Sequence, residues 1–384
     1  MIQTANRLLS IEEYYFSKKL REVRGLIAEG RPIINMGIGS PDLKPSEAVM
    51  TTLKEAIEDA GAHQYQSYQG LSELRQAIAN FYSEKFGVTA DPASEILPLM
   101  GSKEGIMHIS MAFLNPGDEV LIPNPGYPTY SAVSKLVGAV PRSYDLSAEE
   151  RWFPNLELLS NQDLSKVKLM WVSYPHMPTG ATANLEQLKA LVAFAKQHQI
   201  LLVNDNPYSF VLGTNPTSIL QVKGAKEVAL ELNSLSKTFN MAGWRVGMVL
   251  GNRAHIDAIL KVKSNMDSGM FYGIQKGAIE ALRSGLDWFE HLDSVYTSRR
   301  VLMFQLADLL NCTYDTKAVG MFVWAKLPVG APSSEVFIDQ VLYEKNIFIA
   351  PGTIFGSSGE GYIRFSLCVT TEKINEAIER FNKK

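Results

Sequence analysis

The stretch VALELNSLSKTFNMAGWRVGMVL, residues 228–250, decides the fold because it joins two predicted strands through a polar turn. Residues 228–233 and 246–250 are short and mainly apolar, as strands covered on both faces are. Between them, Lys237 closely follows the end of the first strand, and Arg245 precedes the second. A lysine held at the end of a buried strand is a candidate catalytic group.

Similar apolar segments recur on the N-terminal side of this stretch, at residues 96–100, 119–122, 168–173 and 200–204. Helical patterns separate them, most clearly at residues 184–197, where apolar side chains repeat at helical spacing. Strands that alternate with helices predict an α/β domain with a mostly parallel central sheet.

The pattern changes on the C-terminal side. A long helix is predicted through residue 309, then extended segments at 321–327, 347–350 and 362–367, and a closing helix from Glu372. This order predicts a smaller α+β unit. The first 45 residues, with a helix around residues 11–28, are too few for a domain and are expected to pack with that unit. The predicted division is 1–45 as the N-terminal arm, 46–284 as the large domain and 285–384 as the small domain.

Composition excludes several classes of partner. The chain has 384 residues, 46% of them hydrophobic, and 37 Lys and Arg against 40 Asp and Glu give a net charge of −3. That balance disfavours binding to nucleic acid or to a membrane surface. The two cysteines, Cys312 and Cys368, are too few for a disulfide framework. The N-terminal sequence also lacks the features of a secretory signal, so we expect a cytoplasmic protein.

Two glycine motifs and the histidines do not support a nucleotide or metal site. In Gly37-Ile38-Gly39 the third glycine of a dinucleotide fingerprint falls at Asp42. Gly101-Ser102-Lys103 lacks the earlier glycine of a phosphate-binding P-loop, so only an anion-binding turn at a helix start remains. The six histidines form no metal-binding pair, and no metal is predicted.

Chemically useful residues follow several of the predicted strands: Ser102, Tyr127, Asp205 and Lys237. In a doubly wound sheet, ligands bind beyond the carboxyl ends of the strands, so these side chains are expected in one pocket. A lysine for imine formation, a carboxylate for a ring nitrogen, a tyrosine and an anion-binding turn are what pyridoxal 5′-phosphate requires of a protein.

These residues also carry a resemblance to a family. The pattern S-x-S-K-x-x-x-x-x-G-x-R runs from Ser234 to Arg245, and D-x-x-Y is found at Asp205 and Tyr208. The chain resembles the class I/II aminotransferases, fold type I pyridoxal-phosphate enzymes, over nearly its whole length. The resemblance implies a three-layer sandwich with a mostly parallel sheet, plus the smaller α+β domain.

The resemblance also implies roles for individual residues. Lys237 would form the internal aldimine and move the substrate proton, Asp205 would pair with the pyridine nitrogen, and Tyr208 would donate to the phenolic oxygen of the cofactor. Ser102, Lys103, Ser234 and Arg245 would surround the cofactor phosphate, together with the backbone from Gly101 to Lys103. Ser236 is a further expected cofactor-binding residue.

Further roles lie on other segments. Tyr127 is similar to the aromatic residue that stacks on the cofactor ring. Tyr65 is similar to the tyrosine that reaches the phosphate of the neighbouring subunit, which implies a homodimer with shared sites. Arg364 would bind the substrate α-carboxylate, and the turn at Ile38 and Gly39 would close over the substrate.

One position departs from the family pattern N-P-x-N-P-T-G, which reads Tyr-Pro-His-Met-Pro-Thr-Gly at residues 174–180. Met177 replaces an asparagine that binds cofactor and substrate in the family, and a thioether cannot donate a hydrogen bond. His176 compensates if its ring turns inward, or is an ordinary surface residue; both readings stay open here.

The predicted function is transfer of an amino group between an L-amino acid and a 2-oxo acid. The alternative is a C–S β-lyase of the same fold, and a remote one is a non-catalytic cofactor-binding regulator. The segments 101–105 and 261–271 look most like the LL-diaminopimelate aminotransferase-like branch. No arginine lies between Arg253 and Arg283, where dicarboxylate-specific relatives carry one. The identity of the substrate side chain stays open.

Overall fold

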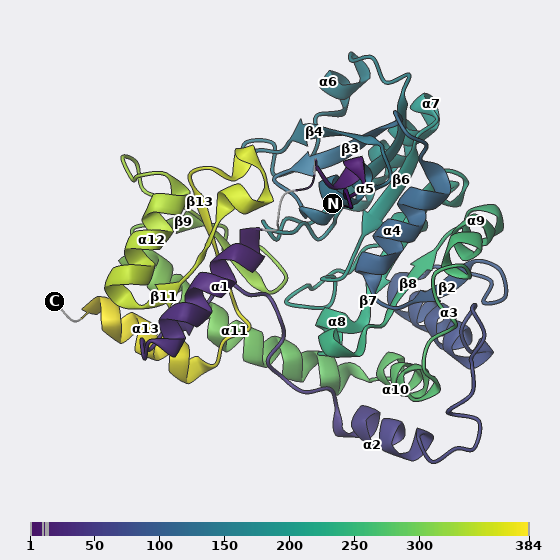
Figure 1. Cartoon of the computed structure of the whole chain (residues 1–384), viewed down its shortest axis with the longest axis horizontal. Helices are drawn as coiled ribbons and strands as arrows, with labels where there is room; N and C mark the ends of the chain where they lie inside the picture. The colour runs from purple at the N-terminus through teal and green to yellow at the C-terminus, as the bar shows by residue number, and fades with distance from the viewer. Residues whose placement is uncertain (1, 10, 12–14, 383–384) are drawn as a thin grey trace.

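A seven-stranded sheet forms the centre of the larger of two lobes (Figure 1). The computed structural model describes residues 2–9, 11 and 15–382. The strand order is β2-β8-β7-β6-β5-β3-β4. The bounds are β2 (Ile96–Leu99), β3 (Glu119–Asn124), β4 (Val140–Asp145), β5 (Val167–Val172), β6 (Leu201–Asp205), β7 (Ala229–Ser234) and β8 (Gly247–Leu250).

The sheet is mostly parallel, as predicted. Strands β3 to β7 run parallel to one another, whereas β8 is antiparallel to both β7 and β2. The segment between β7 and β8 contains only short helical turns, α8 (Leu235–Thr238) and a 3₁₀ turn at Ala242–Trp244. A parallel crossover needs a longer connection, so the chain reverses here.

Helices cover both faces of this sheet and complete the predicted three layers. One face carries α4 (Ser102–Phe113), α5 (Thr129–Leu136) and α9 (Arg253–Lys263). The other carries α3 (Ser72–Phe86), α6 (Leu156–Ser160), α7 (Leu185–His198) and α10 (Tyr272–Leu282), with α2 (Glu47–Ala56) packed on α10.

Strand β5 shows why these strands read as apolar on both sides. Leu169 and Trp171 pack into the core under α4, α5 and α9, and Met170 packs into the core on the opposite face. Side chains alternate between faces along a strand, so a central strand needs apolar residues at every position.

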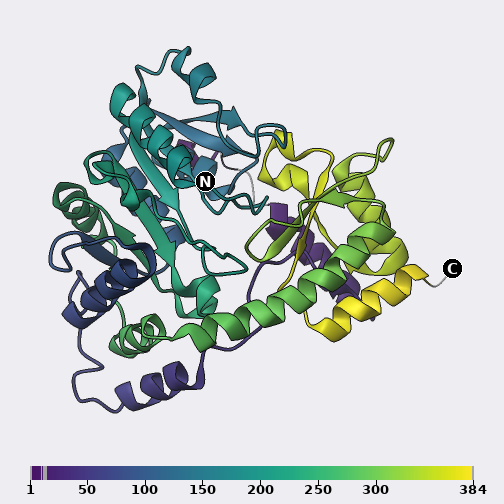
Figure 2. The same ribbon diagram turned by 180° about the vertical axis from the view of Figure 1, so that it is seen from behind.

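The smaller lobe is built on a four-stranded antiparallel sheet in the order β12-β13-β10-β9. Its strands are β9 (Thr313–Tyr314), β10 (Phe322–Lys326), β12 (Ala350–Pro351) and β13 (Tyr362–Ser366), and its helices are α12 (Ser334–Lys345) and α13 (Thr371–Asn382). The long helix α11 (Leu286–Leu309), predicted from the sequence, runs from the larger lobe into the smaller one (Figure 2).

The N-terminal segment packs with the smaller lobe only in part, because the 3₁₀ turn at Asn6–Leu8 contacts α5 of the larger lobe, against the sequence expectation (Figure 1). Strand β1 (Ile34–Asn35) pairs in parallel with β11 (Ile347–Phe348), and Phe16 and Val23 of helix α1 (Tyr15–Ala28) join the core of this lobe. Of the helix predicted at residues 11–28, residues 12–14 lie outside the described residues. The domain boundaries at residues 45 and 284 stay a prediction.

Two sequence predictions about strands need correction. Strand β4 was not predicted because it is an edge strand with polar residues and a proline, and its side chains are largely exposed. The extended segment 347–350 is two strands that belong to different sheets, β11 and β12. In the part of the chain that the structure describes, no helix has the length and apolar character needed to cross a membrane.

Candidate active site

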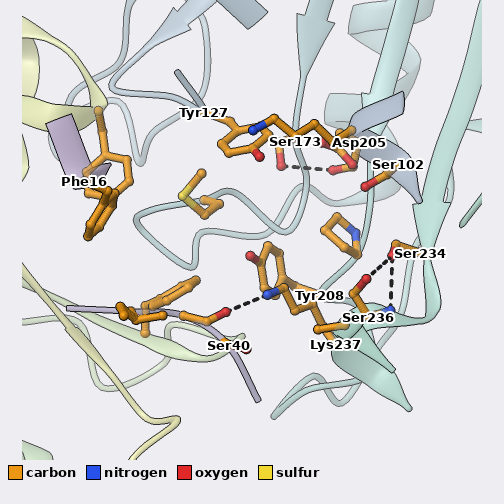
Figure 3. Close-up of a pocket in the computed structure, with 18 of the residues that line it drawn as sticks. Phe16, Ser40, Ser102, Tyr127, Ser173, Asp205, Tyr208, Ser234, Ser236 and Lys237 are labelled. Atoms are coloured by element: carbon orange, nitrogen blue, oxygen red, sulfur yellow. Dashed lines mark hydrogen bonds between the residues drawn. The ribbon is translucent and has the colours of Figure 1, made fainter. Parts of the chain in front are cut away.

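A pocket of about 560 Å³ is lined by residues of both lobes (Figure 3). The larger lobe contributes the ends of β6 and β7, the start of α4 and the loop before α5. The smaller lobe contributes β10, β13 and the segment at Phe355, and α1 contributes Phe16 and Leu20. The pocket therefore lies where the carboxyl ends of the parallel strands meet the second lobe.

Most of the residues singled out from the sequence line this pocket. They are Ile38, Gly39, Ser102, Lys103, Tyr127, Met177, Asp205, Tyr208, Ser234, Ser236, Lys237, Arg245 and Arg364. Gly101 lies directly behind the lining, next to Arg245. Tyr65 is not among the lining residues and its side chain is 91% exposed.

Lys237 lies in α8, the single helical turn that follows β7. Its Nζ donates to the carbonyl oxygen of Gly39 at 2.6 Å, so the amine is held against the N-terminal loop (Figure 3). Burial lowers the pKa of Lys237. The positive charges of Arg364 and Arg245 lower this pKa further, and Cys368 acts in the opposite direction. A larger fraction of this amine is therefore neutral than for an exposed lysine.

Asp205 ends strand β6 and is buried. Its Oδ2 accepts a hydrogen bond from the hydroxyl of Tyr130 at 2.8 Å. Its Oδ1 is buried and has no hydrogen-bond partner among the described residues. Burial raises the pKa of Asp205 to about 6, although the Tyr130 hydrogen bond acts in the opposite direction. One carboxylate oxygen is thus fixed, and the other still needs a partner.

The neighbours of Asp205 fix its backbone. The side-chain amides of Asn204 and Asn206 donate to the two carboxyl oxygens of Glu231 on β7, at 3.1 and 3.0 Å. Glu231 is fully buried, and burial raises its pKa to about 7. Because the residues on both sides of Asp205 are tied to β7, the carboxylate projects from a rigid strand end.

A cup lined by hydrogen-bond donors lies at the start of α4. Gly101 caps this helix with a φ of 91°, and a Cβ at this position would overlap the guanidinium of Arg245. The Ser234 hydroxyl donates to the Ser236 hydroxyl at 2.8 Å, and Ser102 opens the helix. Hydroxyls, a guanidinium and a helix N-terminus form a suitable environment for a phosphate dianion.

Arg364 lies on β13 at the smaller lobe's side of the pocket and is 4% exposed. Its Nη2 donates to the carbonyl oxygen of Gly37 at 2.8 Å. The guanidinium carbon lies 3.9 Å from the ring centre of Phe322 and 4.6 Å from that of Phe355. Aromatic faces hold a planar guanidinium in place without using its donors.

Met177 also contacts this arginine, since its Sδ lies 3.6 Å from Nη1 of Arg364. His176 is not a surface residue, so this one of the two sequence alternatives is wrong. It is 2% exposed and does not line the pocket. Its Nδ1 lies 2.8 Å from Oγ1 of Thr179, and burial lowers its pKa to about 3. His176 is therefore a neutral residue inside the loop: its ring turns inward, but it does not line the pocket.

Sequence analysis missed several lining residues, among them Phe16, Leu20, Tyr130, Phe322 and Phe355. Tyr130 had a local signal, since it stands three residues after Tyr127 in the same Pro- and Tyr-containing segment that follows β3. The phenylalanines come from elements far away in sequence, and no local pattern connects them with Lys237.

A group outside the pocket brings together Glu104, His108 and Asp267, whose ligand atoms lie within 4.8 Å of one another. The ammonium of Lys263 lies 2.8 Å from a carboxylate oxygen of Asp267. This lysine already supplies a positive charge where a metal ion would have to bind.

Comparisons with known proteins agree on one family. Residues 31–381 match the family described as Aminotransferase class I and II. The chain is 40% identical to an LL-diaminopimelate aminotransferase of Maridesulfovibrio salexigens, over 99% of this chain and 98% of that protein.

Solved structures are similar over the whole chain. A substrate-bound BacF from Bacillus subtilis has a TM-score of 0.94 and 34% identity, covering 100% of this chain and 98% of the other. An aromatic aminotransferase from Pyrococcus horikoshii has a TM-score of 0.87 and 29% identity, covering 95% and 98%. The match over residues 31–381 and these full-length similarities show that the chain belongs to the class I and II aminotransferases, enzymes that depend on pyridoxal 5′-phosphate.

Proposed function

We propose that the pocket described above is where this aminotransferase binds pyridoxal 5′-phosphate and exchanges an amino group between an L-amino acid and a 2-oxo acid. One observation carries the proposal: a partly buried lysine amine and a buried carboxylate oxygen without a partner among the described residues line the same pocket, at Lys237 and Asp205. When bound, the cofactor supplies an aldehyde for the amine and an electron-withdrawing ring.

The residues fit this cofactor. A buried carboxylate oxygen without a hydrogen bond is costly, and a protonated pyridine nitrogen would give Oδ1 of Asp205 its donor. Tyr127 lines the pocket near Asp205 and would lie against the ring face. Tyr208, 9% exposed, would donate to the phenolic oxygen of the ring.

The phosphate would lie in the cup at the start of α4. Ser102, Ser234 and Ser236 offer hydroxyls there, and Lys103 and Arg245 offer positive charge. The close approach of the Arg245 guanidinium to Gly101 puts that charge beside the helix N-terminus, where the helix dipole adds to it.

Lys237 is suited to two tasks. Its lowered pKa favours the neutral amine, which is the form that attacks a carbonyl carbon. Once released, the same neutral Nζ can accept the proton from Cα of the substrate. The hydrogen bond to the Gly39 carbonyl holds Nζ in the pocket before substrate arrives.

Arg364 would bind the α-carboxylate of the substrate. Its guanidinium is held by the Gly37 carbonyl and by aromatic rings, so little rotamer freedom is lost on binding. The sulfur of Met177 is a weak acceptor for Arg364 and does not compete strongly with a carboxylate.

A homodimer is part of the proposal. Tyr65 and Tyr68 lie in a segment whose backbone, at Gln66, closely approaches Gly269, and the neighbouring Met266 and Phe271 are also exposed. A second copy of the chain would cover this exposed apolar patch. Tyr65 would then reach the phosphate of the other subunit.

A cytoplasmic location is likewise proposed. It is supported by the two free cysteines, Cys312 and Cys368, since a reducing compartment keeps thiols in this state.

The test is turnover of purified protein reconstituted with pyridoxal 5′-phosphate. Product should form only when an amino donor and a 2-oxo acid, either pyruvate or 2-oxoglutarate, are both present. Lys237→Ala should abolish turnover, and Lys189→Ala, an exposed position on α7, should not change it. Release of ammonia and pyruvate from a cysteine thioether without any oxo acid would instead identify a β-lyase.

A further inference from the structure

We infer that the amino donor of this enzyme carries an apolar side chain, aromatic or branched aliphatic, rather than a charged one. The inference rests on the proposed function, because it takes Lys237 as the amine site and Arg364 as the carboxylate site. It goes further by assigning the part of the pocket that receives the side chain.

The two ends of the pocket differ in chemistry. The end at α4 and β7 carries the serines and Arg245, as the phosphate cup requires. The opposite end is made by α1, the N-terminal loop, the smaller lobe and the loop after β5, and apart from Ser40 its side chains are mainly apolar. They are Phe16, Leu20, Ile38, Met177, Phe322 and Phe355. A substrate with its amine at Lys237 and its carboxylate at Arg364 leaves its side chain to this apolar end.

Each charged group of the described lining has a task. Among the described lining residues, the charged types are Lys103, Asp205, Lys237, Arg245 and Arg364. Lys103 and Arg245 belong to the phosphate cup. Asp205 is assigned to the cofactor ring and Lys237 to the cofactor aldehyde. Arg364 is assigned to the substrate carboxylate. The described lining therefore has no further charged residue to pair with a second carboxylate or ammonium of the substrate.

This arrangement disfavours an amino donor whose side chain carries charged groups. Burying an ionic group without a partner costs several kcal/mol, whereas an apolar group gains about 25 cal/mol per Å² of buried surface. Diaminopimelate carries a second ammonium and a second carboxylate at its far end. The apolar end of this pocket therefore separates the chain in specificity from the relatives named for that substrate, although it is 40% identical to one of them.

Phe16 and Leu20 are the most direct candidates for specificity-determining residues. They are one helical turn apart on α1 and so lie on the same face of this helix, and both line the pocket. Phe16 also stands over Arg364, with its ring centre 5.8 Å from the guanidinium carbon. Phe16, which would receive the substrate side chain, therefore lies next to Arg364, which would bind the substrate carboxylate.

The first test compares donors on the holoenzyme. L-phenylalanine, L-leucine, L-methionine and L-alanine are compared with LL-diaminopimelate, L-lysine and L-glutamate, each with both oxo acids. The best apolar donor should exceed diaminopimelate in kcat/KM by roughly 100-fold or more. Turnover that favours a charged donor overturns this inference and leaves the proposed function intact. Absence of cofactor binding and of all turnover overturns both.

The second test measures binding without turnover. In titrations of the holoenzyme followed by cofactor absorbance, 3-phenylpropionate should bind roughly tenfold or more tightly than glutarate. Equal or tighter binding of glutarate overturns the inference.

Variants on α1 test whether this helix determines the preference for an apolar side chain. Phe16→Ala should lower the ratio of kcat/KM for phenylalanine to that for alanine by roughly tenfold or more. Leu26→Ala is the matched control, since Leu26 lies on α1 and packs against the same core as Phe16 but does not line the pocket, and it should leave the ratio unchanged. An unchanged ratio in Phe16→Ala, with the protein folded and loaded, overturns the role assigned to Phe16.

Discussion

Asp205 shows most clearly how a residue can serve the site at a cost to the fold. Burial raises its pKa to about 6 from the usual 3.8, so the folded chain holds this proton more tightly than the unfolded chain. The free energy of unfolding of the cofactor-free protein therefore falls as pH rises from about 4 through 6, by up to about 3 kcal/mol from this group.

Asp205→Asn removes this titration while keeping the side-chain shape. The cofactor-free variant should be more stable than the natural chain by about 3 kcal/mol at pH 8, and by less at pH 5. Urea unfolding at the two pH values measures the difference. A stability difference that is the same at pH 5 and pH 8 would show that Asp205 does not titrate as described. The variant should also bind the cofactor more weakly, because a neutral amide lacks the charge that favours a protonated pyridine nitrogen.

Met177 is the second residue with a specific prediction, because it touches both Arg364 and the apolar end of the pocket. Met177→Leu keeps an apolar wall, and Met177→Asn restores the polar group of the family pattern. We expect Met177→Asn to lower the preference for phenylalanine over alanine several-fold, and Met177→Leu to retain it. Steady-state kinetics with phenylalanine and alanine measures this preference in each variant. A uniform gain with all donors in Met177→Asn would mean that the thioether only leaves a hydrogen bond unmade.

At the scale of elements, the turn from β2 into α4 depends on Gly101. An alanine there would combine a φ of 91° with an overlap of its Cβ and the Arg245 guanidinium. Gly101→Ala should therefore raise the dissociation constant for pyridoxal 5′-phosphate by roughly tenfold or more.

Gly117 provides the matched control for this turn. Its φ is 89°, and a Cβ there would meet nothing within 4 Å. Gly117→Ala should thus cost about 1 kcal/mol of stability through the backbone but leave cofactor affinity unchanged. If both variants lose affinity equally, backbone strain rather than the contact with Arg245 is the cause.

The elements that were predicted correctly are those with a strong local pattern. Strand β5 is apolar on both faces and α11 is a long continuous helix, so each could be recognised within a short window. Strand β4 could not, because an edge strand has one unpaired side and tolerates polar residues. The antiparallel direction of β8 depends on the length of a connection rather than on the residues of the strand itself.

The site was predictable to the extent that its residues follow strands. Asp205 ends β6, and Lys237 lies in the turn that follows the neighbouring strand β7, so topology alone brings them together. Phe16 and Phe355 reach the pocket only through the packing of the smaller lobe, which no local pattern specifies. The position of His176 depends on the loop's own hydrogen bonds, such as that with Thr179, and was also beyond local reasoning.

At the scale of the whole molecule, the exposed position of Tyr65 predicts that the active sites are shared between subunits. A single chain leaves this side chain outside its own pocket, although the resemblance gives it a role at the phosphate. Lys237→Ala and Tyr65→Phe should each reduce activity when expressed alone. Mixed dimers should then contain one site with both changes and one with neither, so activity should recover after subunit exchange.

A matched control for this experiment mixes Lys237→Ala with Asp205→Asn. If Asp205 acts in the same subunit as Lys237, as their neighbouring strands require, every site of a mixed dimer carries one lesion and activity should not recover. Recovery in this control, or none in the Tyr65→Phe mixture despite proven subunit exchange, would contradict the shared-site arrangement.

The central claim, that Lys237 holds the cofactor in the pocket between the lobes, is tested most directly by chemical reduction. The protein loaded with pyridoxal 5′-phosphate is treated with borohydride, digested and mapped by mass spectrometry. Reduction converts an imine into a stable secondary amine, so one pyridoxyl group should be found per chain, on Lys237, and it should be absent from Lys237→Ala. A label on another lysine such as Lys103, or no label on protein that has bound the cofactor, would contradict the account.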